Sequence, residues 1–293
     1  MGVLTVGVVG AGFMGSGIAA SSAFAGKEVL LYEPTEPPLA RSREWLTDTT
    51  ATAVARGRLT ADEAAEVAER IGFTTHVEDL RRADAVIEAV VEDPGVKGDL
   101  FGKLDSLLPD AQFLASNTSS IAIGSLAART AHPERVLGMH FFSPVAVMKL
   151  VEVVAAVDTS AQALDAAEAF ARDIGKQPIR AKDRSGFVVN LLLVPYLMAA
   201  VRMFEEGFAS REDIDSGMKL GCGHPMGPLQ LCDFIGLDVL AAVCDSLYDE
   251  FKRPEYAPPP VLRRMVAAGH LGRKTGEGFY IHTPRQGANE AAG

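Results

Sequence analysis

The sequence predicts an α/β protein with a doubly wound, mostly parallel sheet, followed by an all-helical C-terminal domain. Three observations support this prediction. A short apolar run near the N-terminus leads into a glycine-rich turn, and apolar runs then alternate with helical patterns as far as residue 183. Beyond that point the patterns are almost all helical. We therefore expect two domains, 1–183 and 184–293.

The composition limits the classes of protein to which the chain can belong. Its 293 residues suit two domains, and the content of 48% hydrophobic and 23% charged residues is typical of a globular chain. The net charge of −10 argues against partners such as nucleic acids and anionic membranes, because their phosphates would be repelled. The three cysteines lack the spacing of a metal site, so we expect no metal and a reduced, cytoplasmic protein.

The first element is a β-branched apolar strand at residues 3–9, which runs directly into the sequence GAGFMG at residues 10–15. A helical pattern follows, and a second strand at residues 29–32 ends at Glu33. This order of strand, glycine turn, helix, strand and acid is typical of a Rossmann-type dinucleotide site. A carboxylate at Glu33 would accept hydrogen bonds from the ribose hydroxyls and repel a 2′-phosphate, which predicts NAD as the cofactor.

The glycine turn has one role for each of its glycines. The first makes the tight turn, the second lets the backbone approach the pyrophosphate, and the third allows close packing of the helix. The N-terminus of that helix supplies amides and a partial positive charge to the phosphates. The predicted cofactor contacts in this segment are Gly10, Gly12, Phe13, Met14 and Gly15.

The remainder of the first domain continues the alternation. We expect helices over about 36–70 and 95–107, and strands at 73–75, 86–91, 113–115, 136–139, 149–154 and 178–180. In parallel sheets, ligands bind beyond the carboxyl ends of the strands. The residues that directly follow strands should therefore gather at one edge of the sheet. They are Gly10, Glu33, Glu92, Ser116 and His140.

The second domain is predicted to be helical throughout. We expect helices over 190–204, from a Ser210 N-cap onward, over 227–250 and over 261–268. The most apolar run, residues 186–201, is interrupted by polar and proline residues and is too short to span a bilayer, so we expect no membrane partner.

Two polar side chains occur in otherwise apolar strands. His140 follows the strand at 136–139, and Glu152 lies inside the sequence VEVV at 151–154. A carboxylate in a buried strand is costly unless it is paired, and a histidine acts as a general base when a carboxylate holds its other ring nitrogen. A purely structural histidine in the core is the alternative. The neighbouring dinucleotide fingerprint favours the catalytic interpretation.

The motifs around these residues occur in the order found in one enzyme family. They are GAGFMGSG, EAVVED, SNTSS, HFFSPV, KLVEV, RSGFVVN, LLVPYL, HPMGPL and GRKTGEGFY. Over residues 4–281 the chain resembles the L-3-hydroxyacyl-CoA dehydrogenases, most of all the single-function bacterial 3-hydroxybutyryl-CoA dehydrogenases. The resemblance implies an oxidoreductase of fatty acid metabolism that uses NAD. It would interconvert an (S)-3-hydroxyacyl-CoA of short chain, such as 3-hydroxybutyryl-CoA, and the 3-ketoacyl-CoA.

The resemblance also implies roles for individual residues. The catalytic set would be His140 as general base, Glu152 as its orienting carboxylate, and Ser119 and Asn190 as groups that hold the substrate. Further cofactor contacts would be Glu92, Lys97, Asn117, Ser119, Ser143 and Lys274. Arg56 and Arg58 lie where the family receives the phosphates of CoA. The helical domain would bind substrate and form a homodimer.

One residue departs from the family pattern. Ser143 stands where the family usually has asparagine, and its shorter side chain bears on substrate choice and rate. A related dehydrogenase of secondary metabolism, acting on a hydroxyacyl unit carried by CoA or by an acyl carrier protein, is therefore an alternative. A non-enzyme alternative is an NAD-binding structural or sensor protein. The intact set of His140, Glu152, Ser119 and Asn190 argues against that second alternative.

Overall fold

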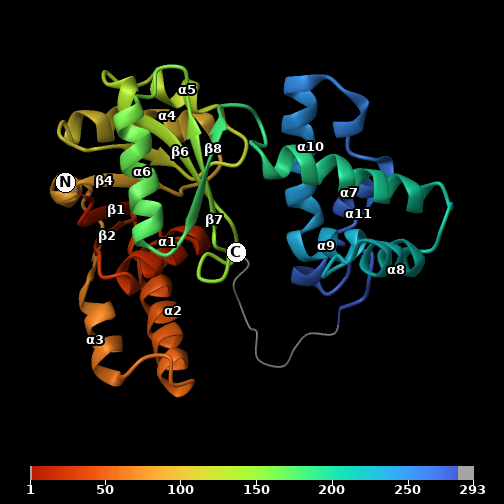
Figure 1. Ribbon diagram of the computed structural model, residues 1–293, viewed down its shortest axis with the longest axis horizontal. Helices are drawn as coiled ribbons and strands as arrows, with labels where there is room; N and C mark the ends of the chain where they lie inside the picture. Colours follow the sequence, from red (N-terminus) through yellow and green to blue (C-terminus); the bar gives the residue numbers. More distant parts are fainter. Residues whose placement is uncertain (1, 283–293) are drawn as a thin grey trace. The chain divides into compact units, whose positions relative to one another are not determined.

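The computed structural model describes residues 2–282 and divides the chain into two compact units, Met1–Arg184 and Ser185–Gly293 (Figure 1). The first unit holds one eight-stranded sheet with helices packed on it, and the second consists of helices. The predicted fold class is confirmed. No helix within residues 2–282 is long and apolar enough to cross a membrane.

The sheet of the first unit has the strand order β3-β2-β1-β4-β5-β6-β7-β8. Neighbouring strands run parallel except for β6 and β7, which are antiparallel. The chain order reverses between β1 and β4, and such a switch point is where doubly wound sheets bind ligands. The strands are β1 (Thr5–Val9), β2 (Glu28–Tyr32), β3 (Ile71–Thr74), β4 (Ala85–Glu88), β5 (Leu114–Ser116), β6 (Val136–Phe141), β7 (Leu150–Ala155) and β8 (Gln177–Lys182).

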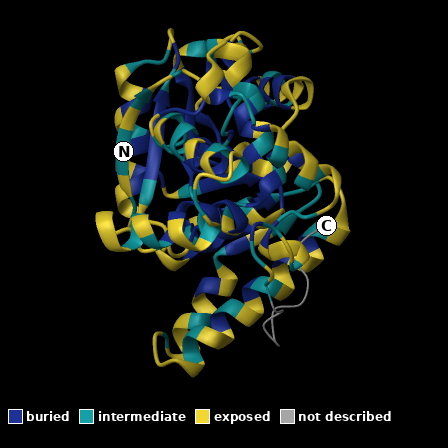
Figure 2. Cartoon of the chain, turned by 90° about the vertical axis from the view of Figure 1, so that its right-hand side faces the viewer, coloured by how far each residue is buried: buried dark blue, intermediate teal, exposed yellow. Residues whose placement is uncertain are grey.

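Helices cover the sheet and share its core. Buried side chains such as Ile18, Leu39 and Phe170 pack with strand residues in one hydrophobic cluster, and the sides of the helices that face outward are exposed (Figure 2). The α-helices of this unit are α1 (Phe13–Phe24), α2 (Glu36–Ala55), α3 (Ala61–Glu69), α4 (Pro94–Leu107), α5 (Ile123–Ala127) and α6 (Ala161–Asp173). Short 3-10 helices, η1 (Val77–Arg82) and η2 (Pro133–Arg135), lie between them.

The predicted single helical stretch over 36–70 is wrong, because the structure has two helices there, α2 and α3. Thr60 starts the second helix with a capping box. Its hydroxyl accepts a hydrogen bond from the amide of Glu63 (3.2 Å), and the Glu63 carboxylate accepts one from the amide of Thr60 (2.7 Å). The capping box satisfies backbone groups that a continuous helix would pair internally.

Within residues 185–282, the second unit packs five α-helices around its own core of buried residues, which includes Leu197, Leu229 and Leu247. They are α7 (Val189–Glu205), α8 (Arg211–Cys222), α9 (Pro228–Ile235), α10 (Leu237–Phe251) and α11 (Pro260–Ala267), with the 3-10 helices η3 (Pro254–Tyr256) and η4 (Arg273–Thr275). The predicted N-cap at Ser210 is confirmed, since its hydroxyl accepts from the amide of Asp213 at 3.1 Å. The predicted single helix over 227–250 is wrong. Gly236, with φ of +104°, separates α9 from α10.

Candidate active site

The glycine turn joins the end of β1 to the start of α1 at the switch point of the sheet. Gly10 has φ of +104°, and a Cβ there would lie 2.6 Å from the carbonyl oxygen of Ala89, which follows β4. A Cβ on Gly15 would lie 1.8 Å from the carbonyl oxygen of Gly10. Both positions therefore require glycine, because the turn crosses β4 closely and α1 packs directly against the turn.

The N-terminus of α1 has the properties of an anion site. Gly12 is its N-cap, with no side-chain cap hydrogen bond and no acidic residue in the first turn. A Cβ on Gly12 would meet nothing within 4 Å, so the backbone is open to a ligand there. The amides of Phe13 and Met14 belong to this first turn. A helix start without its own capping group fits the diphosphate of a dinucleotide.

Glu33 lies beside the glycine turn, directly after β2. Its carboxylate accepts a hydrogen bond from the amide of Ala11 at 3.2 Å. The amide of Gly10 donates to the carbonyl of Tyr32 at 2.8 Å, which holds the turn against the end of β2. The carboxylate is therefore at the edge of the glycine turn, where a ribose hydroxyl would need an acceptor.

A buried ion network lies at the carboxyl ends of β4 and β5. The ammonium of Lys97, on α4, is 2.6 Å from Glu88 and 3.2 Å from Glu92. The side chain of Lys97 is only 1% exposed, so it does not lie on a solvated helix surface. Glu92, which follows β4, is 39% exposed and is the member of the network that faces solvent.

The SNTSS loop after β5 is tied to this network. Glu92 accepts hydrogen bonds from the hydroxyl of Thr118, from the amide of Ser119 at 3.2 Å and from the hydroxyl of Ser120 at 3.0 Å. Burial alone raises the pKa of Glu92. The charge of Lys97 and the hydrogen bonds from Thr118 and Ser120 outweigh it and hold the pKa below its ordinary value. The carboxylate is therefore ionised at neutral pH.

Asn117 and Ser119 sit at the turn between β5 and α5. The side-chain oxygen of Asn117 accepts from the amide of Phe141 at 2.9 Å, which connects the ends of β5 and β6. Ser119 does not cap α5. The carboxylate of Asp183 does so instead, accepting from the amides of Ile123 (2.8 Å) and Gly124 (2.7 Å). A capping role for Ser119 is thereby ruled out, and the residue is half-buried with its amide bonded to Glu92.

His140 and Glu152 face each other across β6 and β7. The antiparallel register pairs the two residues directly, and His140 Nδ1 lies 2.7 Å from Glu152 Oε2. Glu152 is 0% exposed and His140 is 7% exposed. Because a carboxylate accepts hydrogen bonds, Nδ1 carries the hydrogen in this pair. The contact fixes both the orientation and the tautomer of the ring, so Nε2 is the proton acceptor.

Three predicted site residues come from a loop of the first unit and from the helical unit. Ser143 is exposed in the loop after β6, where it precedes a cis proline. Asn190 and Lys274 belong to the helical unit. Asn190 lies in the first turn of α7, and the ammonium of Lys274 is 2.6 Å from the carboxylate of Asp238 on α10. The first unit therefore brings together the glycine turn, Glu33, the Lys97 network and the His140–Glu152 pair at the ends of its strands.

Sequence reasoning missed Glu88 as a member of the site, and it placed Ser116 at this edge of the sheet without giving it a role. The signal was available, because Glu88 is a carboxylate in the apolar run VIEAVV, the same kind of anomaly that singled out Glu152. Its hydrogen-bond partners were not predictable, since Ser116 and Lys97 come from other elements.

Comparison with known proteins accounts for both units. Residues 5–184 match the family described as 3-hydroxyacyl-CoA dehydrogenase, NAD binding domain, and residues 186–282 match the 3-hydroxyacyl-CoA dehydrogenase, C-terminal domain. The chain belongs to the 3-hydroxyacyl-CoA dehydrogenase family. It is an NAD-dependent 3-hydroxyacyl-CoA dehydrogenase, and the uncapped start of α1 is where its residues fit the cofactor diphosphate.

Individual relatives cover nearly the whole dehydrogenase. It is 51% identical to a 3-hydroxybutyryl-CoA dehydrogenase of Mycobacterium tuberculosis, over 94% of this chain and 98% of that one. It is 43% identical to a 3-hydroxybutyryl-CoA dehydrogenase of Clostridioides difficile, over 93% and 97%. The solved structure of (S)-3-hydroxybutyryl-CoA dehydrogenase from Ralstonia eutropha superposes with a TM-score of 0.93 at 43% identity, covering 96% of this chain and 100% of that one.

Proposed function

We propose that this dehydrogenase interconverts (S)-3-hydroxybutyryl-CoA and acetoacetyl-CoA, with His140 as the general base. The observation that carries the proposal is the buried contact of 2.7 Å between His140 Nδ1 and Glu152. Named relatives at 51% and 43% identity support the short acyl chain. The non-enzyme alternative is set aside by the membership of the chain in this family of enzymes.

The His140–Glu152 pair supplies the proton transfer. His140 Nε2 takes the proton of the 3-hydroxyl group while hydride leaves the same carbon, and the C–O bond becomes a carbonyl. Glu152 holds the ring and stabilises the imidazolium that forms. When bound, NAD accepts that hydride, and NADH returns it in the reverse direction. In reduction, the His140 imidazolium gives its proton to the developing alkoxide.

The remaining predicted residues have supporting roles in this proposal. Ser119 and Asn190 donate hydrogen bonds to the substrate oxygen and thioester region, which stabilises the charge that develops there. Asn117 and Ser143 lie toward the nicotinamide. Glu92 and Lys97 serve the nicotinamide ribose, and Lys274 contributes from the helical unit. The half-buried Ser119, bonded through its amide to Glu92, supports this assignment.

The carboxylate of Glu33 is proposed to select NADH over NADPH. Replacement Glu33→Ala removes both the acceptor for the ribose and the repulsion of a 2′-phosphate, so the ratio of kcat/KM for NADPH to that for NADH should rise by about tenfold or more. Steady-state kinetics with both cofactors measures the ratio. Glu36→Ala, three residues on in the exposed start of α2, is the control and should leave the ratio unchanged. A variant at Glu33 that gains nothing with NADPH would contradict this account.

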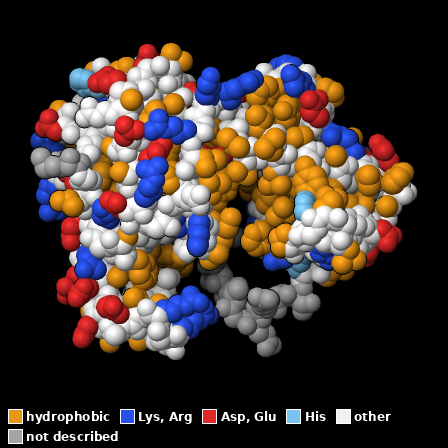
Figure 3. All heavy atoms as spheres, viewed as in Figure 1, with side chains coloured by type: hydrophobic (Ala, Val, Ile, Leu, Met, Phe, Trp, Pro, Cys, Tyr) orange, Lys and Arg blue, Asp and Glu red, His pale blue; other side chains and the backbone are white. Residues whose placement is uncertain are grey.

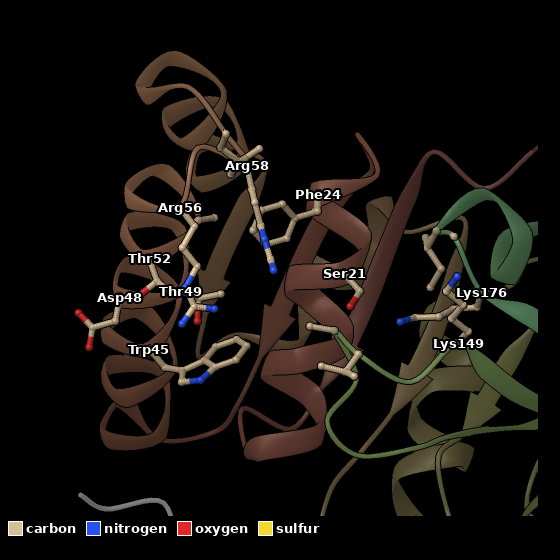
Figure 4. Close-up of a pocket in the computed structure, with 16 residues that line it drawn as sticks. Ser21, Phe24, Trp45, Asp48, Thr49, Thr52, Arg56, Arg58, Lys149 and Lys176 are labelled. Carbon is tan, nitrogen blue, oxygen red and sulfur yellow. The ribbon is translucent and has the colours of Figure 1, made fainter. Parts of the chain in front are cut away.

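A cavity of about 650 Å³ in the first unit supports CoA as the carrier of the acyl group (Figure 4). In the figure Arg56 and Arg58 lie on one side of α1, and Lys149 and Lys176 lie on the other. The ring of Trp45 also lines the cavity. Four cations beside an indole suit the phosphates and the adenine of CoA, despite the net charge of −10. A carrier protein has no adenine to place there, so the cavity favours CoA.

A panel of thioesters tests the proposed function. NADH absorbance is followed with acetoacetyl-CoA, longer 3-ketoacyl-CoA substrates, acetoacetyl-pantetheine and an acetoacetyl acyl carrier protein. We expect acetoacetyl-CoA to have the highest kcat/KM, and the pantetheine thioester to lose about tenfold or more because it cannot reach the cavity cations. A higher kcat/KM for the carrier-protein substrate would favour the secondary-metabolism alternative. A longer preferred chain would overturn the assignment of 3-hydroxybutyryl-CoA.

We also propose that the enzyme forms a homodimer through its helical unit. Large apolar side chains are exposed on that unit, including Leu192 at 71%, Phe208 at 78% and Leu220 at 87%. On the face shown in Figure 3, hydrophobic side chains gather over this unit. Exposed apolar area of this kind is characteristic of surfaces that bind another protein.

The proposed location of the enzyme is the cytoplasm. Its three cysteines are free thiols, and Cys232 and Cys244 are buried in the helical unit. Burial raises the pKa of the Cys244 thiol to about 12, so it stays protonated and inert. Unpaired buried thiols are typical of proteins from reducing compartments.

A further inference from the structure

Glu88 is a fully buried carboxylate at the end of β4, outside the set of residues assigned to the reaction. It is 0% exposed. One of its oxygens accepts from the amide of Val90 and from the ammonium of Lys97, each at 2.6 Å. The other accepts from the hydroxyl of Ser116 at 2.7 Å. Both oxygens are thus engaged, and a buried charge with these partners holds them in one geometry.

Lys97 depends on Glu88 for its position. Three acceptors surround its ammonium: Glu88 at 2.6 Å, Glu92 at 3.2 Å and the carbonyl of Val90 at 3.4 Å. An ammonium has three N–H donors, and acceptors on these sides hold it in one position, with Glu88 the nearest of them. Glu88 is the fully buried carboxylate of the two, and an ammonium without it would lie in an apolar interior with too little compensating charge.

Glu92 transmits this arrangement to the active-site loop. One of its oxygens faces Lys97, and the other accepts from Thr118, Ser119 and Ser120. The Glu92 carboxylate therefore holds the conformation of the 118–120 loop. Lys97 holds the position of that carboxylate, and Glu88 holds the position of Lys97. This chain of contacts lies wholly within the first unit and connects β4, α4 and the loop after β5.

We propose that Glu88 is a positioning residue for the cofactor site. Through Lys97 it fixes the Glu92 carboxylate and the 118–120 loop before NAD or NADH binds, so that no ordering is required on binding. The proposal rests on the proposed role of Glu92 and Lys97 at the nicotinamide ribose. A pre-arranged site binds more tightly than a loose one because the ordering cost is met during folding.

The test uses Glu88→Gln, which keeps the shape of the side chain and removes its charge. We expect the NADH dissociation constant, measured by fluorescence titration without acyl-CoA, to rise about tenfold. We expect KM for NADH to rise in parallel. We expect a smaller loss in kcat, through Ser119 of the same loop, because the His140–Glu152 pair is untouched. A milder variant, Ser116→Ala, removes one donor to Glu88, and the dissociation constant should rise about threefold.

A double-mutant cycle separates positioning from general destabilisation. If Glu88 acts through Lys97, the double variant Glu88→Gln/Lys97→Met should bind NADH no more weakly than Lys97→Met alone. Asp105→Asn is the matched control, because Asp105 is a buried carboxylate paired with Arg135 at 2.5 Å in the same unit. It should lower the melting temperature and leave the NADH dissociation constant unchanged.

Three outcomes overturn the proposal. In the first, Glu88→Gln binds NADH with the dissociation constant of the unsubstituted enzyme. In the second, the losses of NADH affinity from Glu88→Gln and Lys97→Met add up in the double variant. In the third, Asp105→Asn loses as much NADH affinity as Glu88→Gln. Failure of the proposed function looks different. In that case the unsubstituted chain binds NADH and the Glu88 variants weaken it as expected, while acetoacetyl-CoA is not reduced.

Discussion

Replacement His140→Ala is expected to lower kcat for acetoacetyl-CoA reduction by a factor on the order of 10³, with NADH binding retained. The methyl group cannot deliver a proton to the developing alkoxide, and water at that position is neither oriented nor matched in pKa. NADH binding should persist because the substitution leaves the glycine turn, Glu33 and the Lys97 network in place. Stopped-flow or steady-state NADH absorbance gives kcat, and fluorescence titration gives the dissociation constant.

His132→Ala is the matched control for this variant. His132 lies in the same unit with a side chain 54% exposed and pairs only loosely with Glu134, at 3.4 Å. Its removal should leave kcat and the melting temperature close to those of the unsubstituted enzyme. If His140→Ala retained turnover within a few fold of normal while folded, the base would have to be another group.

Replacement Glu152→Gln should lower kcat by a factor on the order of 10². The amide is nearly the same shape, so the fold should persist. The amide NH₂ group can donate to Nδ1, which favours the tautomer with its hydrogen on Nε2, and the imidazolium loses its buried counter-charge. The same absorbance assay measures this effect, and a melting curve establishes that the variant is folded.

Glu168→Gln serves as the control for a glutamate that has no role in the reaction. Glu168 is also buried in the first unit, where it pairs with Arg172 at 2.7 Å and with Arg180. The substitution is chemically identical, and kcat should not change. Equal losses of kcat in the two variants would mean that these buried carboxylates contribute only to stability. That result would contradict the orienting role proposed for Glu152.

The errors in the predicted elements have a common cause. Residues 36–70 are rich in helix-forming residues. However, α2 ends just before Gly57, which has φ of +65°, and the capping box of Thr60 and Glu63 then starts a new helix. The break at Gly236 is similar, since a single glycine inside an apolar periodic run reads as tolerated. Local patterns fix the type of an element better than its ends.

The cavity lined by Arg56 and Lys149 and the buried contact between Lys97 and Glu88 were beyond the reach of sequence. Lys97 alone reads as a surface lysine of an amphipathic helix, because its burial depends on where α4 meets β4 and β5. Lys149 and Lys176 are far from Arg56 in the sequence. They line a cavity with it only because the fold places the segments that precede β7 and β8 beside α1. No local sequence pattern encodes these contacts between distant segments.

The sequence by itself determined the fold class, the NAD cofactor and the family, because each depends on short segments whose chemistry is local. A glycine turn between a strand and a helix needs no distant residue to be recognised. The tertiary structure decided the geometry of the pair proposed to be catalytic. Glu152 reaches His140 only because β7 turns back antiparallel to β6, so that a residue near the start of one strand faces a residue near the end of the other. The hydrophobic pattern of the two strands and the segment that joins them set that register, so it depends on parts of the chain outside either residue.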